Sequence, residues 1–276
     1  MERKGKLTPL ESRLVECAAT GDELDCTPTG ATTGEFDQID DWEERKIRAE
    51  VLVALCTGEV SEWSVHPRRG VRLRGAYVAG QVDLSRAELT QCPLAFHTCY
   101  FDEDVVLVQA TATDLSFTSC ALASLYGDLL DSSASLTLTE THLRQMSFDG
   151  ASFRGKILLS DVSLTNPGGY VLNADGMSAG DVFLVGTQVE GEVRLLGAKL
   201  SGQLGCDQGT KLTNPGGYAL NADSCRVGHS LIFRLREAAV GEVNLAYAQI
   251  GTLADDLASW PDTYDLGGFS YHSLGP

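Results

Sequence analysis

Residues 164–175 read Leu-Thr-Asn-Pro-Gly-Gly-Tyr-Val-Leu-Asn-Ala-Asp, and residues 212–223 repeat this string with alanine in place of valine. The two copies are identical at eleven of twelve positions and begin 48 residues apart. A second match follows them, because Gly-Glu-Val occurs at 191–193 and again at 241–243. Near-identical segments at a regular interval are typical of proteins that stack one structural unit many times. The sequence therefore predicts a repeat architecture.

A shorter repeat, which runs from Val71 to Leu253, indicates the shape of the stacked unit. Apolar residues alternate with polar ones over two or three positions and are followed by a turn, as at Ala151-Ser152-Phe153. Segments this short cannot form an ordinary sheet of hairpins. They fit a coil with four short walls and about 20 residues per turn, whose turns hydrogen-bond to one another at a spacing of about 4.8 Å. The chain has room for about eight or nine such turns.

Two amphipathic helices are expected before these repeats. Thr8 with Glu11 forms a capping box, and Gly21 is a plausible end for the first helix. Residues 22–39 have no periodicity and are expected to be a loop. A second helix is expected to start near Asp40 or Asp41 and to end near Gly58. Because an open stack of strands exposes backbone and apolar groups at its end, these helices are expected to form a cap.

The short apolar pairs resemble those of the pentapeptide-repeat class of right-handed β-helices, as at Ala87-Glu88-Leu89 and Ala198-Lys199-Leu200. This resemblance implies a mainly β protein built as a right-handed, quadrilateral β-helix. The expected division is an N-terminal helical cap at 1–66, the β-helix at 67–258 and a C-terminal capping segment at 259–276. The chain departs from the class in its irregular repeats and in the insertions at 167–169 and 215–217.

A narrower resemblance covers nearly the whole chain. It is to actinobacterial β-helical proteins that are often labelled "membrane-associated oxidoreductase". The segments that carry it include Arg48–Leu52, Glu62–Pro67, Gly70–Ala76, Leu164–Gly169, Gly191–Ala198, Trp260-Pro261 and Gly268–Tyr271. In longer members the last of these segments leads into further helices and membrane spans. The resemblance therefore implies a place in a larger membrane-linked architecture.

The formal net charge is −17, which argues against direct binding to nucleic-acid phosphates and favours basic partners. Between Arg86 and Arg144 there is no lysine or arginine. This acidic stretch is either a solvated acidic surface or a surface that contacts a protein partner. The side chains assigned to that role are Asp102, Glu103, Asp104, Asp114, Asp128, Asp131 and Glu140.

The motifs of the common cofactor and nucleophile sites are missing. The chain has no Gly-rich dinucleotide or P-loop pattern, no His-Glu-x-x-His and no Gly-x-Ser-x-Gly. No catalytic residue, metal ligand or cofactor is therefore assigned. A metal site is conceivable if His97 and His142, which lie about two turns apart, project from stacked turns.

The eight cysteines contain no Cys-x-x-Cys pair, so zinc and redox motifs are not indicated. Cys99 and Cys120 are 21 residues apart, and Cys206 and Cys225 are 19 apart. These separations are close to one turn of the expected coil. Stacked, reduced and buried thiols that pack as small hydrophobes are the expected arrangement.

The Asn-Pro-Gly-Gly segments are expected to be corner loops. Proline fixes φ, glycine accepts positive φ and asparagine begins a turn. The residues given this structural role are Asn166, Pro167, Gly168, Gly169, Asn214, Pro215, Gly216 and Gly217. A surface loop that recurs two turns later can also serve as a binding ridge.

The leading interpretation is a non-enzymatic β-helical scaffold that binds an unidentified protein. Two alternatives stay open: an acidic mimic of DNA that acts on an enzyme such as gyrase, and an enzyme with an acidic site on one wall. No membrane span and no secretory signal are recognised, so the cytoplasm is the expected location.

Overall fold

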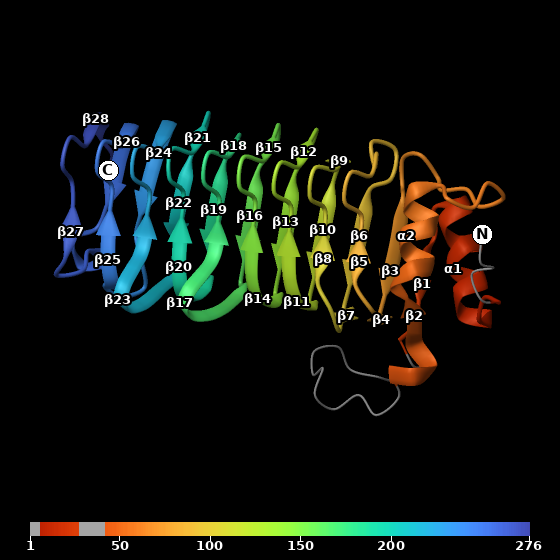
Figure 1. The fold of residues 1–276 in the computed structure, drawn as a ribbon. Helices are drawn as coiled ribbons and strands as arrows, with labels where there is room; N and C mark the ends of the chain where they lie inside the picture. Colours follow the sequence, from red (N-terminus) through yellow and green to blue (C-terminus); the bar gives the residue numbers. More distant parts are fainter. Residues whose placement is uncertain (1–5, 28–41) are drawn as a thin grey trace.

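The computed structural model, which describes residues 6–27 and 42–276, shows a parallel β-solenoid of about nine turns. The turns stack along one axis, and two helices lie at the N-terminal end (Figure 1). The expected mainly β, four-sided helix with an N-terminal helical cap is confirmed. Successive turns pair in parallel register, so that Leu115, Leu136 and Ile157 stand in one column.

One sheet forms two adjacent walls, which we number 1 and 4. Wall 1 contains β1 (Glu23–Asp25), β3 (Val71–Arg74), β6 (Leu94–His97), β10 (Leu115–Thr118), β13 (Leu136–Thr139), β16 (Ile157–Ser160), β19 (Val182–Val185) and β22 (Leu204–Asp207). Wall 4 contains β9 (Thr111–Ala112), β12 (Asp131–Ser132), β15 (Ser152–Phe153), β18 (Ser178–Ala179) and β21 (Lys199–Leu200). The two walls join through longer strands that bend around their common corner, namely β24 (Arg226–Phe233), β26 (Gln249–Asp255) and β28 (Ser270–Leu274).

The other sheet forms walls 2 and 3. Wall 2 begins with β2 (Lys46–Arg48), β4 (Tyr77–Ala79) and β7 (Tyr100–Phe101). Wall 3 contains β5 (Val82–Asp83), β8 (Val105–Val106) and β27 (Tyr264–Asp265). Strands that cross from wall 2 to wall 3 are β11 (Ala121–Tyr126), β14 (His142–Ser147), β17 (Ser163–Asn173), β20 (Gln188–Arg194), β23 (Lys211–Asn221) and β25 (Val240–Asn244).

The core is a set of columns that run along the solenoid axis, because the same wall position points inward in every turn. On wall 1, Phe96 and Phe117 occupy adjacent turns with their ring centroids 5.2 Å apart, and Phe101 packs edge-on against both rings. All three rings are almost completely buried. The alternation of burial along each wall is the reason that the sequence alternates with period two.

Two of the four corners repeat a left-handed backbone conformation. The corner between walls 1 and 2 places Thr98, Ser119 and Glu140 at φ of 52°, 50° and 50° in successive turns. The corner between walls 3 and 4 has Gln109 and Leu129 at 57°. Residues other than glycine occupy this region at a cost of roughly 1–2 kcal/mol. The pairing of each turn with its neighbours must outweigh that cost.

The first expected helix is confirmed as α1 (Pro9–Thr20), with the Thr8–Glu11 capping box formed and Gly21 at its C-terminal end with φ of 78°. The second helix, α2 (Ala49–Thr57), ends at Gly58 as expected but begins later than Asp41. A 3-10 turn (Trp42–Arg45) and β2 precede it. In the expected loop, β1 pairs with β3, while residues 28–39 of that loop lie outside the described residues. Segments for which local periodicity suggested helix or loop are therefore strands, because they pair with the first full turn of the solenoid.

Strand pairing extends into both expected end segments. Within the first 66 residues, β1 and β2 pair with the first full turn of the solenoid. Within residues 259–276, β27 pairs with β25, and β28 pairs with β26. The stacked structure therefore reaches Leu274.

The cysteines follow the expectation for one pair and depart from it for the other. All eight are free, and Cys99 and Cys120 lie buried in adjacent turns at the corner of walls 1 and 2. Their thiols donate to the carbonyl oxygens of Leu73 and Phe96, both at 3.4 Å. Cys206 and Cys225 belong to a single turn and are not stacked on each other, because Cys206 lies on wall 1 and Cys225 directly precedes the wall 4 part of β24.

Candidate functional site

The duplicated segments form two protruding loops at equivalent places, in β17 and in β23, with β20 between them. We call them the first loop (Asn166–Tyr170) and the second loop (Asn214–Tyr218). Figure 1 shows both as ribbons that swing out at the lower edge of the solenoid. The strand register shifts across each loop, so the inserted residues project without disturbing the wall.

Each loop is closed by its asparagine. The side-chain amide of Asn166 donates to the carbonyl oxygen of Tyr170 at 2.8 Å, and that of Asn214 donates to the carbonyl oxygen of Tyr218 at 2.7 Å. The first glycine, Gly168 or its equivalent, has positive φ (74° in the first loop and 80° in the second). The asparagine, the proline and the positive-φ glycine therefore give both loops one fixed shape.

The second glycine of each loop makes room for that asparagine. A Cβ atom on Gly169 would lie 2.6 Å from the side-chain nitrogen of Asn166, and one on Gly217 would lie 2.8 Å from that of Asn214. The expected structural role of these loop residues therefore has a physical basis.

The loops also explain the Gly-Glu-Val matches. Each loop lies over the next turn of the solenoid, where it meets Gly191 or Gly241. A Cβ on Gly191 would lie 2.7 Å from the carbonyl oxygen of Asn166, and a Cβ on Gly241 would lie 2.5 Å from that of Asn214. These glycines have φ of 140° and 114°. The duplicated unit is therefore two turns, one with the loop and one that receives it.

A hollow of about 650 Å³ lies beside the second loop. Gly216, Gly217 and Tyr218 form one side, and residues 261–263 form the other. Its charged groups are the carboxylates of Glu242 and Asp262, and Val240, which is 45% exposed, adds apolar surface. The hollow thus combines negative charge with an apolar patch.

The surroundings of the first loop differ because Arg194 stands where the second unit has Asn244. The Arg194 guanidinium lies 5.1 Å from the centre of the Tyr170 ring and donates to the hydroxyl oxygen of Tyr170 at 3.0 Å. It also pairs with Asp175 at 2.7 Å. At the second loop, Asn244 donates instead to Asn221 at 3.0 Å. The first loop is therefore held by a cation, while the second borders an acidic hollow.

The acidic residues that the sequence singled out lie at different corners. Asp102, Glu103 and Asp104 stand between walls 2 and 3, and the remaining members are distributed over the other corners and wall 4. Several of them bridge turns: Asp102 accepts from the amide of Gly80 at 2.7 Å, and Asp128 accepts from the amide of Asp149 at 3.0 Å. The other members of the set are Asp114, Asp131 and Glu140. They do not gather on one wall, and their partner role stays a prediction.

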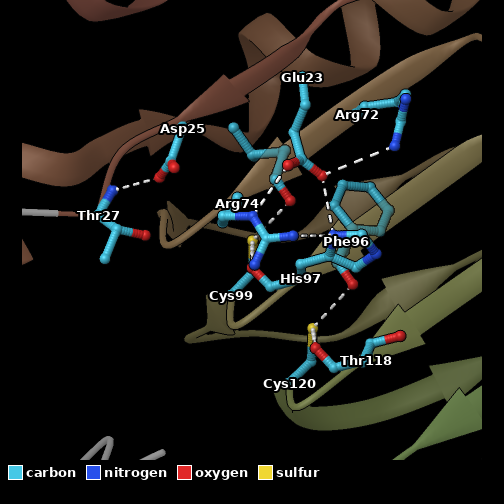
Figure 2. A network of polar contacts seen from close by, with 11 residues as sticks. Glu23, Asp25, Thr27, Arg72, Arg74, Phe96, His97, Cys99, Thr118 and Cys120 are labelled. Carbon is cyan, nitrogen blue, oxygen red and sulfur yellow. Dashed lines mark hydrogen bonds and ion pairs between the residues drawn. The ribbon is translucent and has the colours of Figure 1, made fainter. Parts of the chain in front are cut away.

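A polar cluster joins the N-terminal strand to the first two turns of wall 1 (Figure 2). Glu23 lies 2.9 Å from the Arg74 Nε atom, 2.8 Å from the His97 Nδ1 atom and 4.0 Å from Arg72. Arg74 also contacts the His97 Nδ1 atom at 2.9 Å. Because it links β1, β3 and β6, this cluster fastens the cap strand.

The histidines expected as conceivable metal ligands are not together, because His97 lies on wall 1 and His142 lies on wall 2, two turns further on. Within residues 6–27 and 42–276, no three His, Cys, Asp or Glu side chains gather as a metal site. In the same part of the chain, no helix is long and apolar enough to cross a membrane.

A second ion pair fastens α1 to the strand that precedes α2. The buried carboxylate of Glu11 receives both the Nε and Nη2 groups of Arg48 at 2.7 Å, and the backbone amides of Thr8 and Arg48 at 2.8 and 3.2 Å. Burial raises the pKa of Glu11, but these hydrogen bonds outweigh it and lower the pKa to about 2. The pair belongs to the cap.

No protein-family model, curated protein or solved structure matches the chain. The structure shows a β-solenoid, and membership of the pentapeptide-repeat class stays a prediction.

Proposed function

We propose that this protein is a non-catalytic interaction scaffold, which presents the first and second loops and the hollow beside Tyr218 to a protein partner. The observation that carries the proposal is the pair of rigid loops with one sequence, held in one orientation on alternate turns. At about 4.8 Å per turn, equivalent atoms of the two loops lie about 10 Å apart. A partner surface that recognises one loop can therefore contact both.

The preformed shape of the loops supports a binding role. Asn166 and Asn214 close the loops, and the prolines restrict their backbones, so that little conformational entropy is lost when a partner binds. Tyr170 is 45% exposed, and tyrosine supplies a large contact area with few rotatable bonds. Both features favour recognition by a protein surface.

Charge indicates the chemistry of that partner. Glu242 and Asp262 border the hollow, and the whole chain carries a formal charge of −17. A partner with lysine or arginine around an apolar anchor would complement this hollow. The resemblance to larger proteins leads us to place the scaffold within a membrane-linked assembly.

The test is photo-crosslinking in extract of the source organism. A benzophenone amino acid replaces Pro167 or Pro215, which are exposed at the loop tips, and in a matched control it replaces the exposed Glu103. We expect one adduct of the same mass from both loop positions and no such adduct from position 103. Substitution of Tyr218 by alanine is expected to weaken the adduct at 215.

The opposite pattern would overturn the proposal. If the partner crosslinks at position 103 and not at the loops, the acidic stretch is the binding surface. If all three positions give the same mixture, the loops bind nothing specifically.

A further inference from the structure

A groove runs along wall 4, away from the two loops. In Figure 1 the strands of this wall, β12, β15, β18 and β21, follow the upper edge, whereas the loops project at the lower edge. The groove has a volume of about 640 Å³ and crosses the strands from β15 to β28. Six strands at about 4.8 Å give it a length of about 24 Å parallel to the solenoid axis.

Two columns of outward-facing residues border the groove. The column at the start of each wall strand contains Ser178, Lys199, Arg226 and Gln249 in successive turns. The inward residue of each strand forms the floor, and a second outward column follows it. Arg154 and His272 stand at the two ends of that second column.

Between those ends, the second column consists mainly of glycines, so few side chains project from the wall there. A Cβ on Gly180 would lie 2.6 Å from the carbonyl oxygen of Gly155, and one on Gly228 would lie 2.5 Å from that of Ser201. A Cβ on Gly251 would be in the same position, 2.4 Å from the carbonyl oxygen of His229. The turn below excludes side chains at these three positions, and the column's other residue, Ser201, is small, so the groove stays open.

The lining is positively charged although the protein is acidic. Lys199 and Arg226 are neighbours in adjacent turns, and Arg154 stands two turns before Lys199 in the other column. All three are exposed, and in the described part of the chain none of them forms an ion pair. No aspartate or glutamate occurs among the described residues that line the groove. Positive charge is thus concentrated on a surface that the net charge alone would make negative.

We propose that this groove binds a linear acidic polysaccharide, whose chain lies along the solenoid axis. Lys199, Arg226 and Arg154 would bind its carboxylates by charge-assisted hydrogen bonds. Ser178, Ser201 and Gln249 would bind hydroxyl groups. This binding site is independent of the protein-binding loops, so either proposal can fail without the other.

The period of the wall favours a sugar chain over other polyanions. Each turn offers one set of side chains every 4.8 Å or so, which is similar to the length of one pyranose residue. An extended acidic peptide advances only about 3.4 Å per residue, so its residues fall out of register with the turns. Single-stranded nucleic acid is bound largely by stacking on successive exposed aromatic rings, whereas Phe153 in this lining is only 3% exposed and the exposed ring of His272 lies at one end.

The apolar part of the lining fits the same ligand. Leu200, Val227 and Ile250 form the floor under the glycine-bordered channel, and they are almost completely buried. A flat floor without projecting side chains accepts the C–H face of a sugar ring at close range. The rim can then bind the polar substituents at the ring edge.

Isothermal titration with hexagalacturonate, the probe for the acidic polymer, tests the proposal. The binding variant is K199A/R226A, and the matched control is R68A/R236A, which removes the same charge from exposed sites away from the groove. We expect the wild type and the control to bind alike, and the binding variant to bind at least about tenfold more weakly. Neutral maltohexaose is expected not to bind.

Three comparisons can overturn the inference. Equal weakening by the two double variants would mean that only net charge matters. Tighter binding of hexaglutamate or of single-stranded DNA than of the sugar, lost in K199A/R226A, would show that the occupant is of another class. No binding of any of these probes would mean that the groove is not a polyanion site. Unchanged circular dichroism of both variants excludes misfolding as the cause.

Discussion

Replacing Glu11 by glutamine should change how the stability of the N-terminal cap depends on pH. The pKa of Glu11 is lowered from an ordinary 4.5 to about 2 in the folded protein. Because the folded pKa is the lower one, the ionised carboxylate stabilises the cap fully above pH 4.5 or so. That contribution is lost as the pH falls from about 4.5 to about 2.

The size of the effect follows from the shift. A difference of about 2.5 pKa units corresponds to about 3 kcal/mol, which we take as an upper limit because Arg48 is 30% exposed and partly screened by solvent. At pH 7 the E11Q variant should be less stable than the wild type by up to about 3 kcal/mol, since it loses the ionised carboxylate and leaves Arg48 without its principal partner. The difference should shrink by about 2–3 kcal/mol when both proteins are compared at pH 2.5.

The assay is hydrogen exchange of the peptide 9–20, read by mass spectrometry between pH 7 and pH 2.5. Local exchange is preferable to global unfolding because the ends of a stacked protein can open independently. E16Q is the matched control, since Glu16 lies on the same helix but is exposed. If E11Q and wild type differ by a constant free energy across the whole pH range, the assigned ion pair does not control the cap.

Three further predictions concern the solenoid itself. The G191A protein should be less stable than the G197A protein by about 2 kcal/mol or more in urea unfolding. Both glycines have positive φ, but only a Cβ atom at position 191 would collide with the loop. Equal losses of stability in the two variants would contradict this. F117A should cost about 3–5 kcal/mol, since its ring is buried against two others, and a loss below 1 kcal/mol or so would show a loosely packed core. Iodoacetamide at pH 8.5 should modify Cys92 before Cys206, because a hydrogen bond from a neighbouring thiol lowers the pKa of Cys92 while burial raises that of Cys206 to about 12. Mass spectrometry of the alkylated protein gives the order of modification, and modification of Cys206 before Cys92 would contradict the prediction.

The walls of the solenoid could be predicted because each wall strand carries its own signal. In Leu115-Ser116-Phe117, the apolar residues face the axis and the serine faces outward, and the same pattern returns 21 residues later. Burial of alternate residues is a local consequence of strand geometry. The fold class therefore followed from short-range periodicity and its repetition.

Elements that depend on distant partners could not be predicted in the same way. Ile47 has helical spacing to Val51, yet it lies in β2 because Lys46–Arg48 pairs with Tyr77–Ala79. Nothing local distinguishes these possibilities. The acidic stretch shows a similar limit, since only the stacking of the turns reveals that Asp128 accepts the amide of Asp149 one turn away. The signal that sequence reasoning lacked was the register of successive turns.

The loops and the groove could be predicted from the sequence to different degrees, for the same reason. Both loops could be recognised in the sequence because each is one contiguous string, Asn166–Tyr170 or Asn214–Tyr218. The groove was not, because Arg154, Lys199 and Arg226 come from three separate turns. Only the observed register places these cations on one wall.

The loops impose a rule on the turns that lie between them. Each loop occupies the space over the following turn, and that turn accommodates it with a glycine at 191 or 241 whose Cβ would collide with the loop backbone. A loop inserted at that glycine would occupy the same space, so adjacent turns cannot both carry one. The duplicated segment is therefore two turns long, which gives the 48-residue interval between its copies. Alternation also sets a spacing of about 10 Å between equivalent atoms of the two loops.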